Sequence, residues 1–441
     1  MLSSVSNIFR VSDLRKKILF TLALIAIYRL GSYVPAPGVD VGQLDAFKKS
    51  ANQSGVLGYL QLFSGGALTQ MAIFALGITP YITSSIIMQI LGVVVPRIEQ
   101  WQQQGAVGQR KITQWTRYLT IVIAIVQATS FTFLLHNGNN ALTGNQRINL
   151  FPVFNTGRVL LIVLTLTAGT ALLMWMGELI TQRGIGNGMS LLIFSSIVSV
   201  FPAQGSLVQA EKGWGALIGI IAVWVVLIFC IVFVEQGQRR IPVQFAKRVV
   251  GRRQYGGQNT YIPLKVNASG VIPLIFASSV LYLPQLLALA LPWNWLRTFI
   301  NDNLSRTDQV LYLVVFALLI VGFAYFYTAI QFDPVKQADT LRKQGGNILG
   351  VRPGPATERY LKRVLNRITL PGALFLAAVA IVPSVIIAVV FKENIAASSR
   401  TGAAAFRFSG TSMLIAVGVA LETMKQIDSQ LTMRNYEGFL K

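Results

Sequence analysis

Residues 58–91 read GYLQLFSGGALTQMAIFALGITPYITSSIIMQIL, an apolar stretch that is interrupted twice. The pair Gly65-Gly66 breaks any helix coming from Leu57, because glycine adopts left-handed backbone freely. Pro80 then removes a backbone hydrogen bond inside the next apolar run. Irregular backbone at membrane depth is tolerated only inside protein or along a cavity. The pattern fits a half-helix that dips into the protein from outside, followed by a complete membrane span, and it fits an amphipathic surface loop for the first piece equally well.

The rest of the chain has the composition of a membrane protein. Of its 441 residues, 53% are hydrophobic and only 12% are charged, whereas about 25% charged is typical of soluble domains. A bilayer core of about 30 Å needs about 20 apolar residues per helix. We therefore predict an all-α membrane protein with ten transmembrane helices. The predicted spans are Ile18–Val34, Phe74–Val95, Trp115–Leu135, Val159–Met176, Met189–Val200, Trp214–Val234, Gly270–Leu289, Val310–Phe332, Thr369–Phe391 and Thr411–Ile427.

The charged residues predict how these spans are oriented. Thirty-eight Lys and Arg against sixteen Asp and Glu leave a net charge of +22. A basic soluble chain would suggest a nucleic-acid partner. Here the basic residues gather in the N-terminal segment and after the even-numbered spans, which the positive-inside rule places in the cytoplasm. Ten spans then put both termini in the cytoplasm. Omitting the short fifth span would turn the two largest basic loops outward, so the charge pattern supports keeping it.

Several classes of function are excluded by missing residue types. Cys230 is the only cysteine and His136 the only histidine, so no His/Cys metal site or Ser/His/Asp triad can be assembled. We predict no metal site and no cofactor, and we expect Cys230 to be a buried, inert thiol. No carboxylate lies in mid-span, which argues against the main alternative, a secondary transporter of a small solute. An intramembrane protease or lipid transferase needs a nucleophile with its base, or paired carboxylates, and neither is visible. Arg29 is expected to reach the membrane interface from the first span.

Ten spans divide into two sets of five. A five-span unit repeated in tandem enters the membrane from the opposite side the second time, and such inverted pairs place a pathway at their shared interface. No clear sequence identity relates the two halves. The expected organisation is a cytoplasmic N-terminal segment at 1–17, an N-terminal half at 18–200, a C-terminal half at 201–427 and a cytoplasmic tail at 428–441. Large cytoplasmic loops are expected at about 235–265 and 333–367.

Seven stretches, in order along nearly the whole chain, resemble the bacterial SecY family. They are FSGGALTQMAIFALGITPYITSSIIMQIL, RGIGNGMSLLIF, VEQGQRRIPVQFAKRVVGRR, PLKVNASGVIPLIFASS, FYTAIQFDPVKQADTLRKQGG, GVRPGPATERYL and GTSMLI. SecY is the central subunit of a protein-conducting channel. The resemblance implies ten helices in two inverted halves around a central pore, with a plug and a lateral gate that opens to lipid.

The resemblance also assigns roles to single residues by motif match. The pore constriction is expected to be ringed by Ile78, Ile82, Ile193, Ile275 and Ile415. The plug is expected at about 57–70, with Leu57, Leu60, Phe63, Gly65 and Gly66. The lateral gate is expected to include Thr83, Gln127 and Asn267. Without the resemblance, the isoleucines read as ordinary helix packing and the polar residues as interhelical hydrogen bonds.

The two large basic loops are expected to form a docking surface for a motor or the ribosome. The docking residues are Arg239, Arg240, Lys247, Arg248, Arg252, Arg253 and Arg352. Arg352 matches the loop arginine that the family associates with SecA, and ribosomal RNA would attract the Arg239–Arg253 cluster through its phosphates. The positive-inside rule alone explains the sign of these loops but not their length.

The resemblance finally implies partners and a function. SecE and SecG are the expected membrane subunits, SecA ATPase or the ribosome supplies the energy, and the cargo consists of signal sequences and unfolded polypeptides. The expected function, without enzymatic activity, is to translocate secretory polypeptides across the bacterial cytoplasmic (inner) membrane and to insert membrane proteins into the lipid bilayer.

Overall fold

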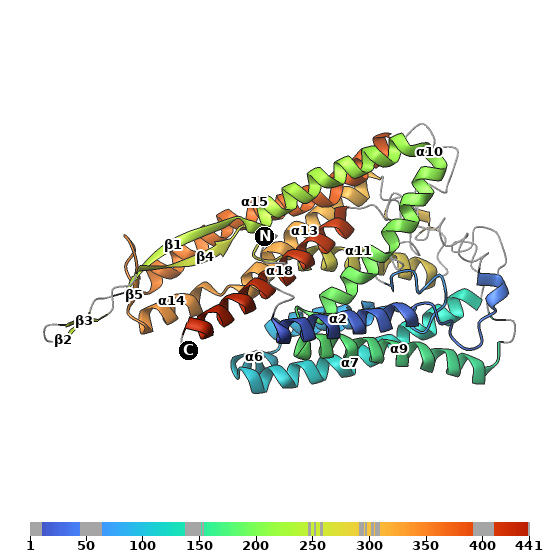
Figure 1. Cartoon of the computed structure of the whole chain (residues 1–441), viewed down its shortest axis with the longest axis horizontal. Coiled ribbons are helices and arrows are strands. Elements are labelled where there is room, and N and C mark those ends of the chain that lie inside the picture. The colour runs from blue at the N-terminus through green and yellow to red at the C-terminus, as the bar shows by residue number, and fades with distance from the viewer. Residues whose placement is uncertain are drawn as a thin grey trace.

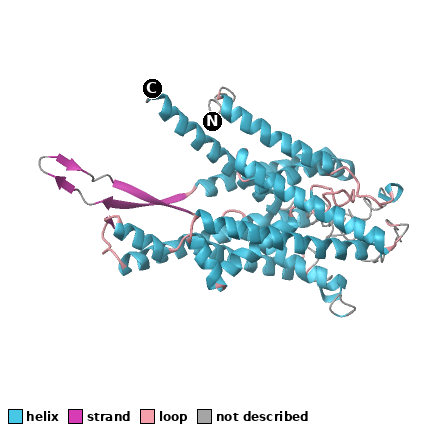
Figure 2. Ribbon diagram, turned by 90° about the horizontal axis from the view of Figure 1, so that it is seen from below, coloured by secondary structure: helices cyan, strands magenta, loops and turns pink. Residues whose placement is uncertain are grey.

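The computed structural model describes residues 11–44, 64–136, 151, 154–245, 248–250, 253–255, 259–290, 295, 298–300, 304, 309–390 and 410–439. Helices make up most of these residues (Figures 1 and 2). The long helices are α2 (Ser12–Gly31), α5 (Thr79–Val94), α7 (Ala106–His136), α9 (Thr156–Arg183), α10 (Gly188–Gln236), α11 (Ile272–Ala290), α13 (Val310–Gln331), α15 (Pro355–Val390) and α18 (Gly410–Phe439). The chain also forms two short helices, α6 (Pro96–Gln103) and α14 (Pro334–Lys343), and a 3-10 turn, η1 (Val41–Gln43).

The predicted ten-helix membrane fold is confirmed, because α10 holds two spans. Its backbone leaves helical geometry at Gly213, where φ is 77° and ψ is −176°. Glycine reaches this conformation without the clash that a side chain would cause. The fifth predicted span therefore continues as helix past Val200, and the backbone turns only at Gly213.

Hydropathy alone identifies only part of this set. Among the described residues, five helices are long and apolar enough to cross a membrane, or six if α5 and α6, which are bent by 99°, count as one span. The apolar pieces Gly188–Ala203 and Ile272–Leu281 are shorter. Such short helices are stable at membrane depth because other helices cover the backbone at their ends.

Several helices extend beyond the predicted spans into polar sequence. Helix α7 begins at Ala106 rather than Trp115, α15 begins at Pro355 rather than Thr369, and α18 runs to Phe439 rather than Ile427. Hydropathy marks only the apolar part of a helix, whereas backbone hydrogen bonding continues until a breaker intervenes. At α15 that breaker is Gly354, whose φ is 101°. Much of the second basic loop and of the tail is therefore helical.

The helices pack into two groups joined by α10 (Figure 1). Helices α2, α5, α7 and α9 pack together, and α11, α13, α15 and α18 form the second group. Helix α10 contacts α9 in the first group and α18 in the second. The described chain ends and the strands lie at one end of the molecule (Figure 1), as expected for an even number of spans.

The two groups repeat one backbone joint, formed by Ile73 in the first and Val266 in the second. The Ile73 N–H donates to the Val34 carbonyl just after α2, and the Val266 N–H donates to the Gly237 carbonyl just after α10, both at 3.0 Å. The carbonyl of Ile73 lies against Gly169 of α9, and that of Val266 against Gly372 of α15. A Cβ at either glycine would overlap the carbonyl oxygen. The equivalent contacts support an inverted repeat.

Short sequence motifs follow the same repeat. GITPYI at 77–82 matches GVIPLI at 270–275 at three of six positions, and GMSLLI at 188–193 matches GTSMLI at 410–415 at four of six. Gly77 and Gly270 share left-handed backbone, with φ of 58° and 62°. Gly188 and Gly410 each lie against a carbonyl of the preceding long helix, that of Gly177 or Val379. The identity is too short to be recognised without the structure, which is why the halves looked unrelated.

The two large basic loops form a common sheet that the sequence analysis did not anticipate. Strands β1 (Gln238–Phe245) and β4 (Asn259–Lys265) pair antiparallel, and β5 (Gly346–Ile348), from the second loop, joins the other edge of β1. Ile241, Val243, Leu264 and Ile348 point into a small core with Leu341 and Leu361. The strands β2 (Arg248–Val250) and β3 (Arg253–Tyr255) form a separate two-stranded ribbon. Alternating apolar residues in QRRIPVQF were the available signal.

The expectation of a buried thiol at Cys230 is wrong, because this side chain is exposed. In the segment Gly213–Gln236, only 11% of the most apolar 18-residue stretch is buried inside the protein. Phe229 and Phe233, on the same helix, are each 74% exposed. An apolar helix with so little protein cover has its side chains facing lipid, and Cys230 shares that surface.

The glycine joint can be tested by adding one methyl group. We expect Gly169→Ala to destabilise the protein by about 1–3 kcal/mol, because the new Cβ collides with backbone that cannot retract without shifting α5. Gly157→Ala is the matched control, since it lies on the same helix and a Cβ there meets no atom within 4 Å. Thermal unfolding in detergent measures both. Equal unfolding temperatures for the two variants would contradict a tight joint.

Candidate functional site

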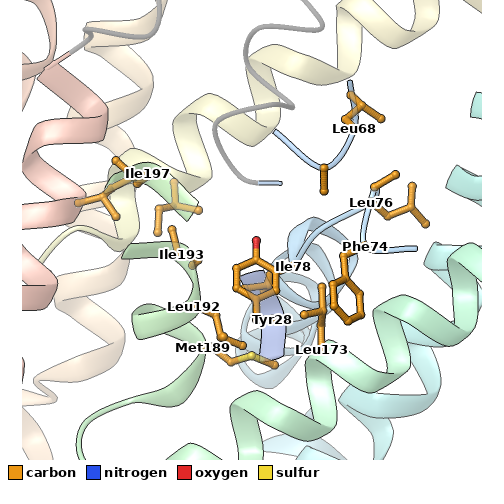
Figure 3. Packing of buried hydrophobic residues seen from close by; sticks show 14 of the residues in the cluster. Tyr28, Leu68, Phe74, Leu76, Ile78, Leu173, Met189, Leu192, Ile193 and Ile197 are labelled. Atoms are coloured by element: carbon orange, nitrogen blue, oxygen red, sulfur yellow. The ribbon is translucent and has the colours of Figure 1, made fainter. Parts of the chain in front are cut away.

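The five isoleucines predicted to ring a pore belong to one hydrophobic cluster. Ile78, Ile193, Ile275 and Ile415 are buried, with 1%, 4%, 8% and 0% exposure, and Ile82 packs against them partly buried. Four helices supply them: α5, α10, α11 and α18. Figure 3 shows Ile78 and Ile193 in this cluster, close to Tyr28. The cluster is the main hydrophobic core of the bundle and takes residues from both helix groups, so the five isoleucines share one core with many other apolar side chains.

The start of α5 explains how Ile78 and Ile82 come to this centre. Gly77 turns the backbone, Ile78 is the residue before the helix, and Pro80 stands in its first turn. The Ile78 carbonyl accepts hydrogen bonds from the N–H groups of Tyr81 and Ile82 at 3.0 and 3.1 Å. Pro80 therefore begins the helix instead of interrupting it, because a first-turn residue has no helical acceptor for its N–H. The repeat motif gives α11 the same start.

Helices α10 and α18 bring in Ile193 and Ile415 from equivalent positions. Each isoleucine is five residues after the glycine that begins its helix. At α10 the Asn187 side chain caps the helix, accepting from the N–H groups of Met189 and Ser190 at 3.1 and 3.5 Å. The repeat thus relates Ile82 to Ile275, and Ile193 to Ile415.

Part of the predicted plug lies within the described residues. Leu57, Leu60 and Phe63 lie outside them. Gly65 and Gly66 both have left-handed backbone, with φ of 61° and 87°. The following residues form turns that are buried in the protein: Ala67, Leu68, Met71 and Ala72 are each at most 2% exposed. A surface loop would leave these side chains exposed, so residues 64–77 run inside the protein.

The three predicted gate residues lie on different elements. The Thr83 hydroxyl donates to the carbonyl of Thr79 in its own helix at 3.0 Å, and Gln127 is partly buried on α7. Asn267 is 5% exposed and donates from Nδ2 to Glu235 Oε2 at 2.9 Å and to the Gly270 carbonyl at 3.2 Å. No hydrogen bond within the described part of the chain joins the three residues to one another.

Sequence reasoning missed a polar cluster beside the isoleucines. The Tyr28 side chain is fully buried, and its hydroxyl lies 2.5 Å from the Ser196 Oγ of α10. Arg29 is partly exposed; its Nη1 donates to the Gly65 carbonyl at 3.0 Å and its Nη2 to the Tyr33 hydroxyl at 3.3 Å. The only signal in the sequence was a tyrosine-arginine pair inside an apolar span.

The described residues among those predicted for docking lie on the sheet formed by the two basic loops and at its border. Arg239 and Arg240 are exposed on β1, and the Arg240 guanidinium lies 4.9 Å from the centre of the Tyr261 ring. Arg352 is exposed just before α15. Because β5 pairs with β1, both loops belong to one platform. Arg248 and Arg253 lie on β2 and β3, and Lys247 and Arg252 fall outside the described residues.

Comparisons with known proteins agree on one family. The SecY family model matches residues 72–424. The protein translocase subunit SecY of Streptomyces galbus is 48% identical over 454 residues, which cover both chains completely. Two solved structures share the fold. One, described as showing that the plug domain of SecY stabilises the closed channel, gives a TM-score of 0.58 at 18% identity and covers 93% of this chain and 91% of that one. Canine Sec61 in a ribosome-channel complex gives 0.55 at 16% identity with the same coverage.

The isoleucine cluster predicts what happens when it is made polar. We expect Ile82→Asn or Ile415→Asn to raise resting ion conductance, because a polar group favours water in a narrow apolar constriction. Ile82→Leu is the matched control and keeps the constriction apolar. Single-channel recording in planar bilayers measures the effect. Unchanged conductance in both Asn variants would count against a ring at these positions.

Proposed function

This chain belongs to the SecY family and is a subunit of a protein-conducting channel, and we propose that it acts as a passive, gated conduit in the bacterial cytoplasmic membrane. Unfolded secretory polypeptides cross through its centre, and hydrophobic segments leave sideways into lipid. The family assignment does not support the alternative of a small-solute transporter. We propose further that the chain has no enzymatic activity of its own and that energy comes from its partners.

The observation that carries this proposal is the apolar centre built by both halves. A channel for many different polypeptides cannot rely on specific hydrogen bonds, because each cargo presents different side chains. A collar of isoleucines holds none of them tightly, and an empty apolar constriction excludes water and ions. Ile82 with Ile275 and Ile193 with Ile415 come from equivalent positions, as a constriction between two inverted halves requires.

The closed state would be completed by a plug and a lateral gate. The buried turns at 64–77 support a plug whose remaining residues include Leu57, Leu60 and Phe63. Thr83, Gln127 and Asn267 are the proposed gate residues. In this proposal, α5 and α11 separate when a hydrophobic signal sequence enters, which is consistent with their packing mainly against α7 and α13 rather than against each other in the described residues.

The basic platform is the proposed docking site for SecA or the ribosome, and SecE and SecG are the proposed membrane subunits. Arg239 and Arg240 lie on β1, and Arg352 lies in the segment between β5, which pairs with β1, and α15; this arrangement supports a single docking face rather than two separate loops. With this platform in the cytoplasm, both termini are cytoplasmic as well. The proposed domain boundaries stay as expected, except that the halves join at Gly213.

Reconstitution tests the function. Vesicles containing this chain and SecE should protect a secretory precursor from added protease when SecA and ATP are present. Vesicles without the chain, and vesicles without ATP, are the controls. If the folded complex gives no more protection than these controls, the proposal is wrong.

The docking platform yields a separate prediction. We expect Arg352→Glu to lower SecA-driven transport about tenfold, since an attractive charge at an interface becomes repulsive. Arg359→Glu is the matched control, because this arginine is also exposed and lies seven residues further on, in α15. Both variants should insert into the membrane normally. Equal transport by the two variants would refute a special role for Arg352.

A further inference from the structure

The polar cluster at the end of α2 holds the stem of the proposed plug by its backbone. Tyr28 contacts the Ser64 carbonyl at 3.4 Å as well as Ser196, and Arg29 donates to the next carbonyl, that of Gly65. Each hydroxyl has one proton: when Tyr28 donates to the Ser64 carbonyl, Ser196 donates to Tyr28 Oη in place of the Leu192 carbonyl, which lies 2.9 Å from Ser196 Oγ. The cluster thereby connects α2, α10 and the plug stem.

This cluster is closed to water and tightly fitted. Tyr28 and Ser196 are 0% exposed and Ser64 is 1% exposed. At Gly65 a Cβ would lie 2.8 Å from Arg29 Nη1 and 3.0 Å from the Ser196 Cα, so the chain is clamped between two helices. At Gly66, by contrast, a Cβ would meet no atom within 4 Å. A buried donor or acceptor that loses its partner is unfavourable. Moving Ser64 and Gly65 therefore breaks the contact of Tyr28 with the Ser64 carbonyl and that of Arg29 with the Gly65 carbonyl.

The two neighbouring glycines, Gly65 and Gly66, differ in how closely other atoms surround them. After Gly66 the chain is fixed again, because Ile73 is held at the joint with Val34 and Gly169. Between the two held points at Gly65 and Ile73, Gly66 lies in open space, where an added Cβ meets no atom within 4 Å. Ser196 lies one helical turn after Ile193 of the isoleucine cluster. Figure 3 shows Tyr28 amid that cluster, with Ile193 and Phe74 on opposite sides.

We propose that Tyr28, Arg29 and Ser196 form a latch that positions the plug stem and sets how easily the channel opens. This inference rests on the proposed function and names residues that act through the stem rather than on the cargo. The latch grips main-chain carbonyls, so it restrains the plug whatever the plug's own side chains are. Because Ser196 shares a helix with Ile193, displacement of the isoleucine collar by an entering chain would strain the latch directly.

Weakening the latch should favour the open state. We expect Tyr28→Phe and Ser196→Ala each to raise transport of a precursor with a shortened apolar signal core about fivefold, as the loss of one net hydrogen bond would allow. Both changes nearly conserve shape, and Tyr28→Phe keeps the ring packed on Phe74. The double variant should gain no more than Tyr28→Phe alone, because Ser196 acts on the stem only through the Tyr28 hydroxyl. Arg29→Met removes the hydrogen bond to the Gly65 carbonyl and should also raise transport of the precursor with the shortened signal core.

The controls separate the latch from the channel function. Ser199→Ala removes a hydroxyl that bonds only to the Ser196 carbonyl within α10, so it should leave transport unchanged. A precursor with an intact signal should be transported equally by all variants. If the unaltered channel fails with that precursor, the proposed function is wrong. If it succeeds and folded Tyr28→Phe, Ser196→Ala and Arg29→Met give no gain with the weak precursor, the latch is wrong.

Discussion

Backbone polar groups inside a membrane protein must find partners within the protein, and the structure depends on how this demand is met where helices are broken. The joints at Ile73 and Val266 meet it twice in the same way. Each residue donates its N–H to the chain that leaves the preceding span, and each carbonyl rests on a helix glycine. These contacts allow α5 and α11 to begin deep in the protein, and this position brings Ile82 and Ile275 to the centre.

The two halves share this plan but use it for different purposes. In the first half, the buried turns at 64–77 surround the joint. Tyr28 and Arg29 contact the carbonyls of Ser64 and Gly65 at their start. In the second half, the chain before the joint forms the β1–β4 hairpin, and Asn267 is held by Glu235. A repeated frame thus carries the proposed plug in the first half and the proposed docking platform in the second. Inverted repeats commonly place a pathway at the interface between such halves.

Most of the frame could be read from residue types along the chain. Ten spans followed from hydropathy together with the positive-inside rule, and keeping the short fifth span was right because α10 does carry it to Gly213. The isoleucines could be named only through motif resemblance, since an isoleucine in a pore and one in ordinary helix packing look alike in sequence. Cys230 was misjudged for a related reason: an apolar neighbourhood along the chain does not distinguish protein interior from a lipid-facing surface.

The sequence by itself determined that this is a ten-span membrane protein of the SecY family, because hydropathy, charge and local motifs are properties of consecutive residues. The pairing of the two basic loops through β1 and β5, the glycine joints and the grip of Arg29 on Gly65 were left to the tertiary fold. Each joins residues far apart in the chain through backbone atoms, which every residue type carries. No pattern of side chains in the sequence predicts such a contact. Only the packed structure determines which carbonyl each N–H or guanidinium group binds.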